Sequence, residues 1–308
     1  MLIERLAVIG VGLIGGSLAR ALRAAGTCGY IIGQDIDRDR LEQAHGLGII
    51  DERALDLGTA VTGADAVVVA VPIGAIRTVF AGICPSLPTR TLVTDVSSVK
   101  GVVVAAARAM LGAHLPYVVP AHPIAGAEHS GVESSSAQLF AGQRVILTPL
   151  PETMRSSTEL VQAMWESAGA EVEVMEADRH DELLAATSHL PHALACALVN
   201  AVTRISGPEA ALRYTAGGFG DLTRIASSSP VLWHDIFLAN RERLCAALTC
   251  FQVEIESLRE AIAGGDGDAL QASLCDAKTV RDALAAERRA RSRHVPAPPM
   301  TIKKEGPR

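Results

Sequence analysis

Short apolar runs recur along the first 176 residues, and each is followed by a stretch of helix-like composition. The runs favour β-strands because they are rich in Val and Ile and are bounded by turn-forming residues. Several are apolar throughout, which is typical of parallel strands covered on both faces. The predicted strands lie at 6–10, 30–35, 66–71, 91–96, 117–120, 145–148 and 171–176.

Helix-length segments separate these runs, and the repeated strand–helix order predicts right-handed crossovers and a doubly wound α/β sheet. The predicted helices lie near 16–25, 38–46, 74–83, 100–111 and 155–168. After about residue 178 no further strand run appears, which indicates an all-α second part. We therefore predict an α/β domain over 1–176, a helical domain over 177–290 and a basic, Pro-rich tail without fixed structure over 291–308.

An apolar stripe marks the helical part. The positions at Leu244, Leu248, Phe251, Ile255, Leu258 and Ile262 follow one another in steps of 4 and 3. Such a stripe is an a/d pattern that covers nearly three heptads. Glycines at 264–267 interrupt it, and a second helix with Leu270, Leu274, Ala277, Val280 and Leu284 follows. The stripe can pack inside its own domain, but we favour an interface with a second subunit.

Composition narrows the possible functions. The chain has 308 residues, of which 49% are hydrophobic and 20% charged, so we expect a globular protein. A net charge of −6 and the lack of a Lys/Arg block before the tail argue against nucleic-acid and membrane partners. No apolar run reaches the roughly 18 residues of a spanning helix, and the apolar start is too short for a signal peptide. Six scattered cysteines without a Cys-x-x-Cys pair indicate reduced thiols and a cytosolic protein.

Three glycines follow the first predicted strand and open the first predicted helix. In that context a Gly-x-Gly-x-x-Gly pattern predicts a dinucleotide-binding turn. Gly10 permits the tight turn, Gly12 lets the backbone approach a pyrophosphate, and Gly15 lets the helix pack on the strand. Unpaired N–H groups at the helix start attract the phosphates. The sequence thus predicts a Rossmann-type domain whose turn, with Leu13 and Ile14, holds the cofactor.

The second predicted strand ends in an acid, Asp35, which lies twenty residues after Gly15. A carboxylate there can accept hydrogen bonds from an adenosine ribose and repels a 2′-phosphate, so it favours NAD over NADP. Asp37 is close enough to compete for this role, and Asp35 can instead cap the following helix. Val71 and Pro72, at the end of another apolar strand, are expected beside the cofactor.

Polar segments stand where strands of such a sheet should end, at 94–101 and 120–128, and others lie in the helical part. His122 has a pKa suited to a base near neutral pH, and a hydroxyl such as that of Ser98 can orient a substrate. Arg224 can clamp a carboxylate. Structural roles stay open for each. Ser97 or Ser98 can cap the helix that follows, His122 can be a hydrogen-bonded loop histidine, and Arg224 can form an ion pair. We expect no metal, because the histidines at 188–192 lack further ligands at a recognisable spacing.

Taken in order, these segments resemble the prephenate/arogenate dehydrogenases of tyrosine biosynthesis, which include the broad-specificity cyclohexadienyl dehydrogenases. The resemblance runs from about residue 6 to residue 284. The strings that carry it are Gly10-Val-Gly-Leu-Ile-Gly-Gly-Ser17, Asp95-Val-Ser-Ser-Val-Lys100, His122-Pro-Ile-Ala-Gly126 with Glu128, Ser130 and Gly131, Ser188-His-Leu-Pro-His192, Gly217-Gly-Phe-Gly-Asp-Leu-Thr-Arg224, and Trp233-His-Asp-Ile-Phe237 with Asn240. One departure is Ala127, where many members carry Thr.

The resemblance implies a catalytic base at His122 and a serine at Ser98 that orients substrate and nicotinamide. It places His192 and Arg224 in the substrate pocket, with Arg224 on a carboxylate. Further pocket neighbours implied are Ser188, Glu128 and Gly217. The implied reaction is NAD-dependent oxidative decarboxylation of prephenate to 4-hydroxyphenylpyruvate, of arogenate to tyrosine, or of both. A homodimer built through the helical domain is also implied, in agreement with the apolar stripe.

Other functions stay open on the residues alone. A β-hydroxyacid dehydrogenase also joins a glycine turn to a helical domain, but it uses a catalytic lysine there. Between residues 178 and 284 the only lysine is Lys278, far along the last helix. A non-catalytic NAD-binding sensor would bind the cofactor without turnover. The choice between prephenate, arogenate and an amino-substituted prephenate is left open by these strings.

Overall fold

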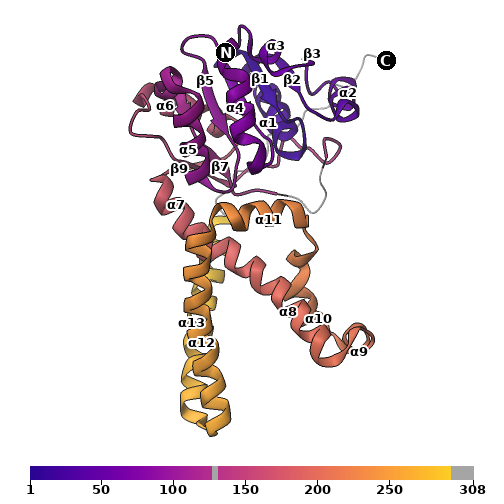
Figure 1. Cartoon of the computed structure of the whole chain (residues 1–308), viewed down its shortest axis with the longest axis vertical. Helices are drawn as coiled ribbons and strands as arrows, with labels where there is room; N and C mark the ends of the chain where they lie inside the picture. Colours follow the sequence, from indigo (N-terminus) through magenta and orange to yellow (C-terminus); the bar gives the residue numbers. More distant parts are fainter. Residues whose placement is uncertain (127–130, 293–308) are drawn as a thin grey trace, which may run out of the picture. The chain divides into compact units, whose positions relative to one another are not determined.

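The computed structural model describes residues 1–126 and 131–292. The chain divides into two compact units, Met1–Leu248 and Thr249–Arg308. The first unit holds two β-sheets with their helices and the helical segment up to α11, and Figure 1 labels most of these elements. The last strand ends at Val174, close to the predicted change from strands to helices. The predicted domain boundaries at 176 and 290 stay predictions.

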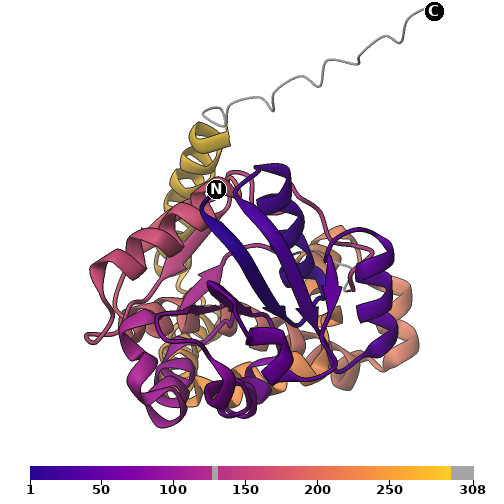
Figure 2. The same ribbon diagram turned by 90° about the horizontal axis from the view of Figure 1, so that it is seen from above.

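The main sheet has six parallel strands in the order β3-β2-β1-β4-β5-β6. They are β1 (Ile3–Ile9), β2 (Cys28–Gln34), β3 (Glu52–Arg53), β4 (Ala66–Val69), β5 (Leu92–Asp95) and β6 (Val118–Val119). The strand order reverses between β1 and β4, which is the switch point where ligands bind in open α/β sheets. Seen from above in Figure 2, the first strands of the chain, in indigo, lie side by side. The structure confirms the Rossmann-type doubly wound sheet.

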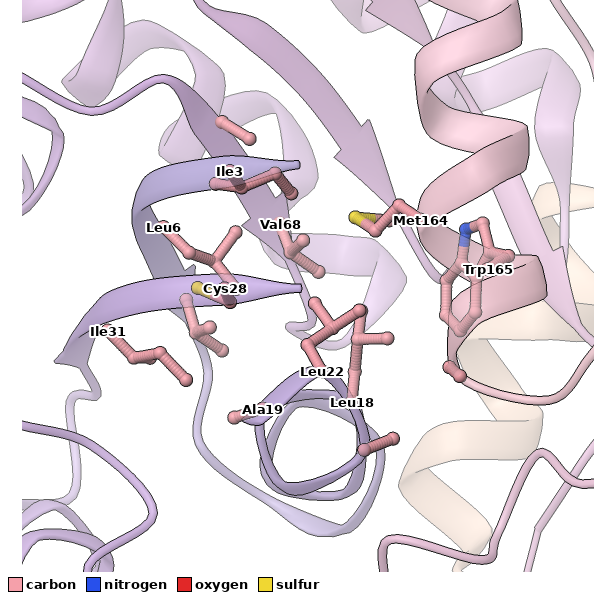
Figure 3. Close-up of a cluster of buried hydrophobic side chains, with 14 of the residues drawn as sticks. Ile3, Leu6, Leu18, Ala19, Leu22, Cys28, Ile31, Val68, Met164 and Trp165 are labelled. Carbon is pink, nitrogen blue, oxygen red and sulfur yellow. The ribbon is translucent and has the colours of Figure 1, made fainter. Parts of the chain in front are cut away.

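Helices cover both faces of this sheet. They are α1 (Leu13–Ala24), α2 (Arg38–Gly46), α3 (Leu57–Val61), α4 (Ile76–Ile83), α5 (Lys100–Met110) and α6 (Arg155–Ser167). Side chains of α1, α2 and α6 pack in one core cluster, and those of α3, α4 and α5 pack in another. Alternate residues of β1 enter the two clusters: Leu6 joins the first and Ala7 the second. In the first cluster, Leu18 and Leu22 of α1 pack with strand residues (Figure 3), and each contributes about 1.5–3 kcal/mol by burial.

A small second sheet carries the strands that follow β6. Its order is β7 (Ala121–Pro123), β8 (Arg144–Leu147) and β9 (Glu171–Val174), with β7 antiparallel to β8. The predicted strands at 145–148 and 171–176 thus belong to a separate sheet and do not extend the main one. Pro120 has no N–H to donate, so the pairing of β6 with β5 ends before it, and β7 pairs with β8 instead. The sequence did not predict β3, β7 or α3, because each is only two to five residues long.

Helices make up the rest of the described chain. They are α7 (Ala177–Leu184), the π-helical turn η4 (Ala185–His189), α8 (Leu190–Ser206), α9 (Pro208–Tyr214), α10 (Gly217–Thr223), the 3₁₀ turn η5 (Arg224–Ser227), α11 (Pro230–Ala239), α12 (Arg241–Gly264) and α13 (Gly267–Ser292). The last helix therefore extends two residues into the predicted tail. The remainder of that tail, from residue 293, lies outside the described residues.

One helical segment of the described chain differs from the expectation that no segment is apolar enough to span a membrane. By length and composition alone, Ala177–Ser206 passes such a test, with a mean hydropathy of 1.2 in its most apolar window. Its side chains, however, make buried polar contacts with the Rossmann-type domain. His180 and Asp181 are 0% and 1% exposed, so this end of the helix belongs to the protein interior.

Candidate functional site

The glycine turn between β1 and α1 has the geometry that its motif predicts. Gly10 has a φ of +93°, and a Cβ there would lie 2.3 Å from the carbonyl oxygen of Ala70. A Cβ on Gly15 would lie 2.1 Å from the carbonyl oxygen of Gly10, so α1 packs directly on the turn. A Cβ on Gly12, the N-cap of α1, would meet nothing within 4 Å. The helix start thus has open space beside its N–H groups, which fits a pyrophosphate.

The register of the main sheet brings the predicted cofactor residues to one edge. Ile9, the last residue of β1, pairs with Gln34 of β2 and Val69 of β4, and Val69 pairs with Asp95 of β5. The residues that follow these strand ends share the carboxyl edge of the sheet. They are Gly10, Gly12, Leu13, Ile14, Asp35, Val71, Pro72 and Ser98. All of these predicted positions therefore lie at one edge of the sheet, the edge where ligands bind in open α/β folds.

Asp35 binds the glycine turn by a hydrogen bond. Its carboxylate accepts hydrogen bonds from the N–H groups of Val11 (3.0 Å) and Asp37 (2.9 Å), and Arg40 Nη1 lies 3.3 Å away. The N-cap of α2 is Asp37, whose side chain accepts from the N–H of Arg40. The alternative in which Asp35 caps this helix is therefore wrong. Of the two acids, Asp35 is the one that contacts the turn.

A buried ion pair fixes the loop that carries Ser98. The side chains of Lys100 and Asp95 are 0% and 1% exposed, and Nζ lies 2.7 Å from Oδ2. The ammonium also donates to the carbonyl of Ala121, and the N–H of Ala121 donates to Asp95 Oδ1 (3.1 Å). Burial lowers the pKa of Lys100, and the Asp95 carboxylate opposes that shift. The pair thus ties the residue before His122 to the end of β5.

His122 lies in β7 and is half-buried. Its Nδ1 is 2.9 Å from Nε2 of His180, and Nδ1 of His180 is 2.8 Å from Oδ1 of Asp181. Burial, together with the positive charge of Lys100 and the neighbouring His180 and His189, holds the pKa of His122 well below its ordinary value. The ring is therefore neutral at pH 7 and can accept a proton.

The helix after Ser98 receives its cap from a distant residue. The N-cap of α5 is Val99, which has no capping side chain. Instead, Asp181 accepts from the N–H groups of Lys100 (2.7 Å) and Gly101 (2.8 Å). Although burial alone would raise the pKa of Asp181, these bonds and the one from His180 hold it below its usual range. A capping role for Ser97 or Ser98 is thus wrong, and the half-buried Ser98 hydroxyl has no hydrogen bond to any described residue.

The π-helical turn η4 presents Ser188 and His189 between α7 and α8. Such turns re-aim side chains and are frequent at functional sites. Ser188 is half-buried, whereas His189 is only 1% exposed. Asn240 Nδ2 donates to His189 Nδ1 (3.2 Å) and to the backbone oxygen of Asp181 (2.8 Å). Burial lowers the pKa of His189 to about 4, so this ring is also neutral.

His192 belongs to an aromatic cluster on the helical side. Its ring stacks on Trp233 of α11, with centroids 3.5 Å apart and planes 13° apart. Burial lowers the pKa of His192. Ile236 of α11 packs with Ile73 and Val99, which directly follow Pro72 and Ser98. The cluster therefore adjoins the sheet edge where the predicted cofactor residues lie.

The other predicted pocket residues are exposed or lie outside the described residues. Gly217 begins α10 and Arg224 begins η5, and both residues are exposed. Their segments pack against α8, the helix of His192. Glu128 and Ala127 lie outside the described residues. The structure thus gathers His192, Gly217 and Arg224 on neighbouring segments and joins His122 to a different group of side chains.

The sequence predicted no role for four residues of the hydrogen-bonded group around His122. Asp95 and Lys100 stood in a recognised string, but nothing local shows that they form a buried ion pair. His180 and Asp181 belong to none of the sequence strings that carry the family resemblance. The sequence did offer one signal for them: a His and an Asp stand next to each other in the first helix after the last strand. Polar residues that face the interior of a protein need hydrogen-bond partners.

Comparisons with known proteins agree with this geometry. Residues 18–174 match the family model of the prephenate dehydrogenase nucleotide-binding domain, and residues 176–276 match that of the prephenate dehydrogenase dimerization domain. The chain is 36% identical over 285 residues to a cyclohexadienyl dehydrogenase of Zymomonas mobilis, covering 91% of this chain and 96% of that protein.

Two solved structures are also similar. One is prephenate dehydrogenase from Aquifex aeolicus in complex with hydroxyphenyl propionate and NAD+, with 38% identity and a TM-score of 0.86 over 91% of this chain and 98% of that one. The other is Synechocystis arogenate dehydrogenase, with 26% identity and a TM-score of 0.79 over 91% of this chain and 100% of that one. The chain therefore belongs to the prephenate dehydrogenase family.

Proposed function

We propose that this protein catalyses the NAD-dependent oxidative decarboxylation of prephenate, of arogenate, or of both. The observation that carries the proposal is His122: a neutral histidine held by a buried partner, next to the loop of Ser98 and beyond the edge of a nucleotide-binding sheet. The relatives named above act on prephenate, cyclohexadienyl compounds or arogenate. Both substrates have a ring hydroxyl that must lose a proton and a ring carboxylate that leaves.

The residues at the carboxyl edge fit NAD. Gly10, Gly12 and Gly15 leave room at the start of α1 for the pyrophosphate, and Asp35 is placed for the adenosine ribose. Leu13, Ile14, Val71 and Pro72 complete the cofactor contacts. When bound, NAD⁺ supplies the acceptor for a hydride.

His122 acts as the general base in this proposal. It accepts a hydrogen bond and then the proton from the ring C4 hydroxyl, while the hydrogen on C4 leaves as hydride and C4–O becomes a carbonyl. The bond to the ring carboxylate then breaks to release CO₂. Its electron pair completes the aromatic ring, and the C4 oxygen becomes a hydroxyl again by taking back the proton from His122. Ser98 holds the hydroxyl and the nicotinamide in line, which is an orientation effect.

The helical segments supply the substrate pocket. Arg224 binds a substrate carboxylate, because a guanidinium matches that group with two parallel hydrogen bonds. His192 contributes to the pocket in this proposal, and Trp233 fixes its ring by stacking. The remaining pocket residues in this proposal are Ser188, Glu128 and Gly217.

The protein works as a homodimer through its helical region. In the described single chain this region has large exposed apolar side chains: Ile205 is 85% exposed, Ile255 48% and Ile262 60%. Of the a/d stripe, Leu244 is buried, Leu248, Phe251 and Leu258 are half-buried, and Ile255 and Ile262 are exposed within one chain. Burial of these side chains in a second copy removes apolar surface from water. All six cysteines are free, which supports a reducing compartment such as the cytosol.

The test is to supply the purified protein with NAD⁺ and either prephenate or arogenate, and to follow NADH and CO₂ together. The proposal predicts equal amounts of both products and little activity with NADP⁺. Tight NAD binding without turnover of either compound would instead support a sensor. NADH from a β-hydroxyacid without CO₂ would support the other dehydrogenase class.

A further inference from the structure

We propose that His180 and Asp181 position His122 and determine which of its ring nitrogens carries the proton. The inference rests on the proposed role of His122 as base, and it adds two positioning residues to that role. Neither residue touches the reacting atoms in this account. They act through a chain of hydrogen bonds that ends at His122 Nδ1.

The Asp181 carboxylate sets the first proton position. It is an acceptor only, so His180 Nδ1, 2.8 Å from Oδ1, must carry a hydrogen. Two backbone N–H groups of α5 hold the same carboxylate in place at 2.7 and 2.8 Å. Because Asp181 is 1% exposed, water does not compete for these bonds. The carboxylate is thus rigid and ionised.

The second proton position follows from the first. A neutral imidazole with its hydrogen on Nδ1 has a lone pair on Nε2. His180 Nε2 lies 2.9 Å from His122 Nδ1, so a His180 with its only hydrogen on Nδ1 accepts there, and the hydrogen between the two rings belongs to His122. The rings meet edge to face at 66°, which suits an in-plane hydrogen bond and excludes stacking. His122 therefore has its bare lone pair on Nε2, the nitrogen left to face a substrate.

The chain also supports the charge that His122 gains. On taking a proton at Nε2, the ring becomes an imidazolium whose Nδ1–H already has an acceptor, and the Asp181 charge lies one ring away. Burial and the Lys100 charge act in the opposite sense, since they disfavour a positive His122 before substrate arrives. Asp95 offsets part of the Lys100 charge. Together these charges keep His122 neutral, so that it can accept a proton from the substrate.

Asp181 links the base to the Ser98 loop as well. The same carboxylate that binds His180 caps α5, which begins two residues after Ser98. One side chain therefore fixes the two groups that must meet at the substrate hydroxyl. A substitution at Asp181 disturbs both, whereas a substitution at His180 leaves the cap intact, so His180 gives the cleaner test.

The test compares His180→Leu, which removes the acceptor, with His180→Gln, whose amide oxygen can still accept from His122. We expect His180→Leu to lower kcat at least about ten-fold with KM little changed, and His180→Gln to recover much of that loss. His45→Leu, an exposed histidine on α2, is the matched control and should leave kcat unchanged. Thermal unfolding of each variant checks that the fold is kept.

Nitrogen NMR of the histidine-labelled protein reads the proton positions directly, with His122→Asn assigning the signals. We expect Nδ1 of His122 protonated and Nε2 bare in the parent protein at pH 7, and a changed distribution in His180→Leu. A parent protein with the hydrogen on Nε2, or a His180→Leu variant with unchanged kcat, overturns the inference. If His122→Asn keeps full activity, the proposed function fails first, so the two failures are distinguishable.

Discussion

Replacing Lys100 by Met tests the buried ion pair at the centre of the site. The change removes an ammonium that is fully buried and leaves Asp95 with only the N–H groups of Ser97 and Ala121 as partners. A buried carboxylate without its counter-charge is destabilising by about 3–5 kcal/mol. For a unit of about this size, each kcal/mol lowers the thermal midpoint by about 2–4 °C. The expected drop is therefore about 6–20 °C.

Thermal unfolding of the cofactor-free protein, followed by circular dichroism, measures this drop. Arg108→Met is the matched control, since Arg108 pairs with Glu152 at 3.1 Å but the two side chains are 48% and 40% exposed. Such surface pairs contribute about 0–1 kcal/mol, so the control should unfold within a few degrees of the parent protein. Adding Asp95→Asn to Lys100→Met removes the unpaired charge and should recover part of the loss. A Lys100→Met protein as stable as the control would refute this reasoning.

Three further outcomes follow from the site. Asp35→Ser should lower kcat/KM for NAD⁺ about 10- to 100-fold and remove the carboxylate that repels a 2′-phosphate, so that NADP⁺ gains, whereas Asp37→Ser keeps its cap and should leave the preference unchanged. Arg224→Ala should raise substrate KM at least about ten-fold with kcat little altered, and an equal KM would remove it from the pocket. For His189, a pKa lowered from 6.5 to about 4 means that the unfolded chain binds the proton first, so about 2 kcal/mol of stability is lost between pH 7 and pH 5. Urea unfolding at both pH values should show this loss in the parent protein and a smaller one in His189→Gln.

The sequence predicted those parts of the fold that local chemistry controls. Gly10 and Gly15 could be assigned because a tight turn and a helix–strand contact each exclude a Cβ, and Gly12 because its place in the motif leaves open space at the helix start. Long apolar strands could be assigned because both faces are buried. The short strand that carries His122 could not, since three residues show no periodicity.

Tertiary contacts explain what the sequence reading missed. Ser97 and Ser98 have the chemistry of helix caps, yet Asp181, 80 residues away, supplies the cap. In the sequence, Lys100 looks like an ordinary residue in the first turn of α5, although its side chain is fully buried. Chain spacing does not show such pairings, because they depend on how α5 and α7 pack.

The central claim is that His122 takes the proton as hydride leaves the substrate. The most direct measurement is kcat of His122→Asn with NAD⁺ and the better of prephenate and arogenate, together with KM and NAD⁺ affinity. The account predicts a kcat at least about 10²-fold lower with KM and NAD⁺ affinity little changed, because removing a general base affects the transition state alone. A kcat near that of the parent protein would contradict it.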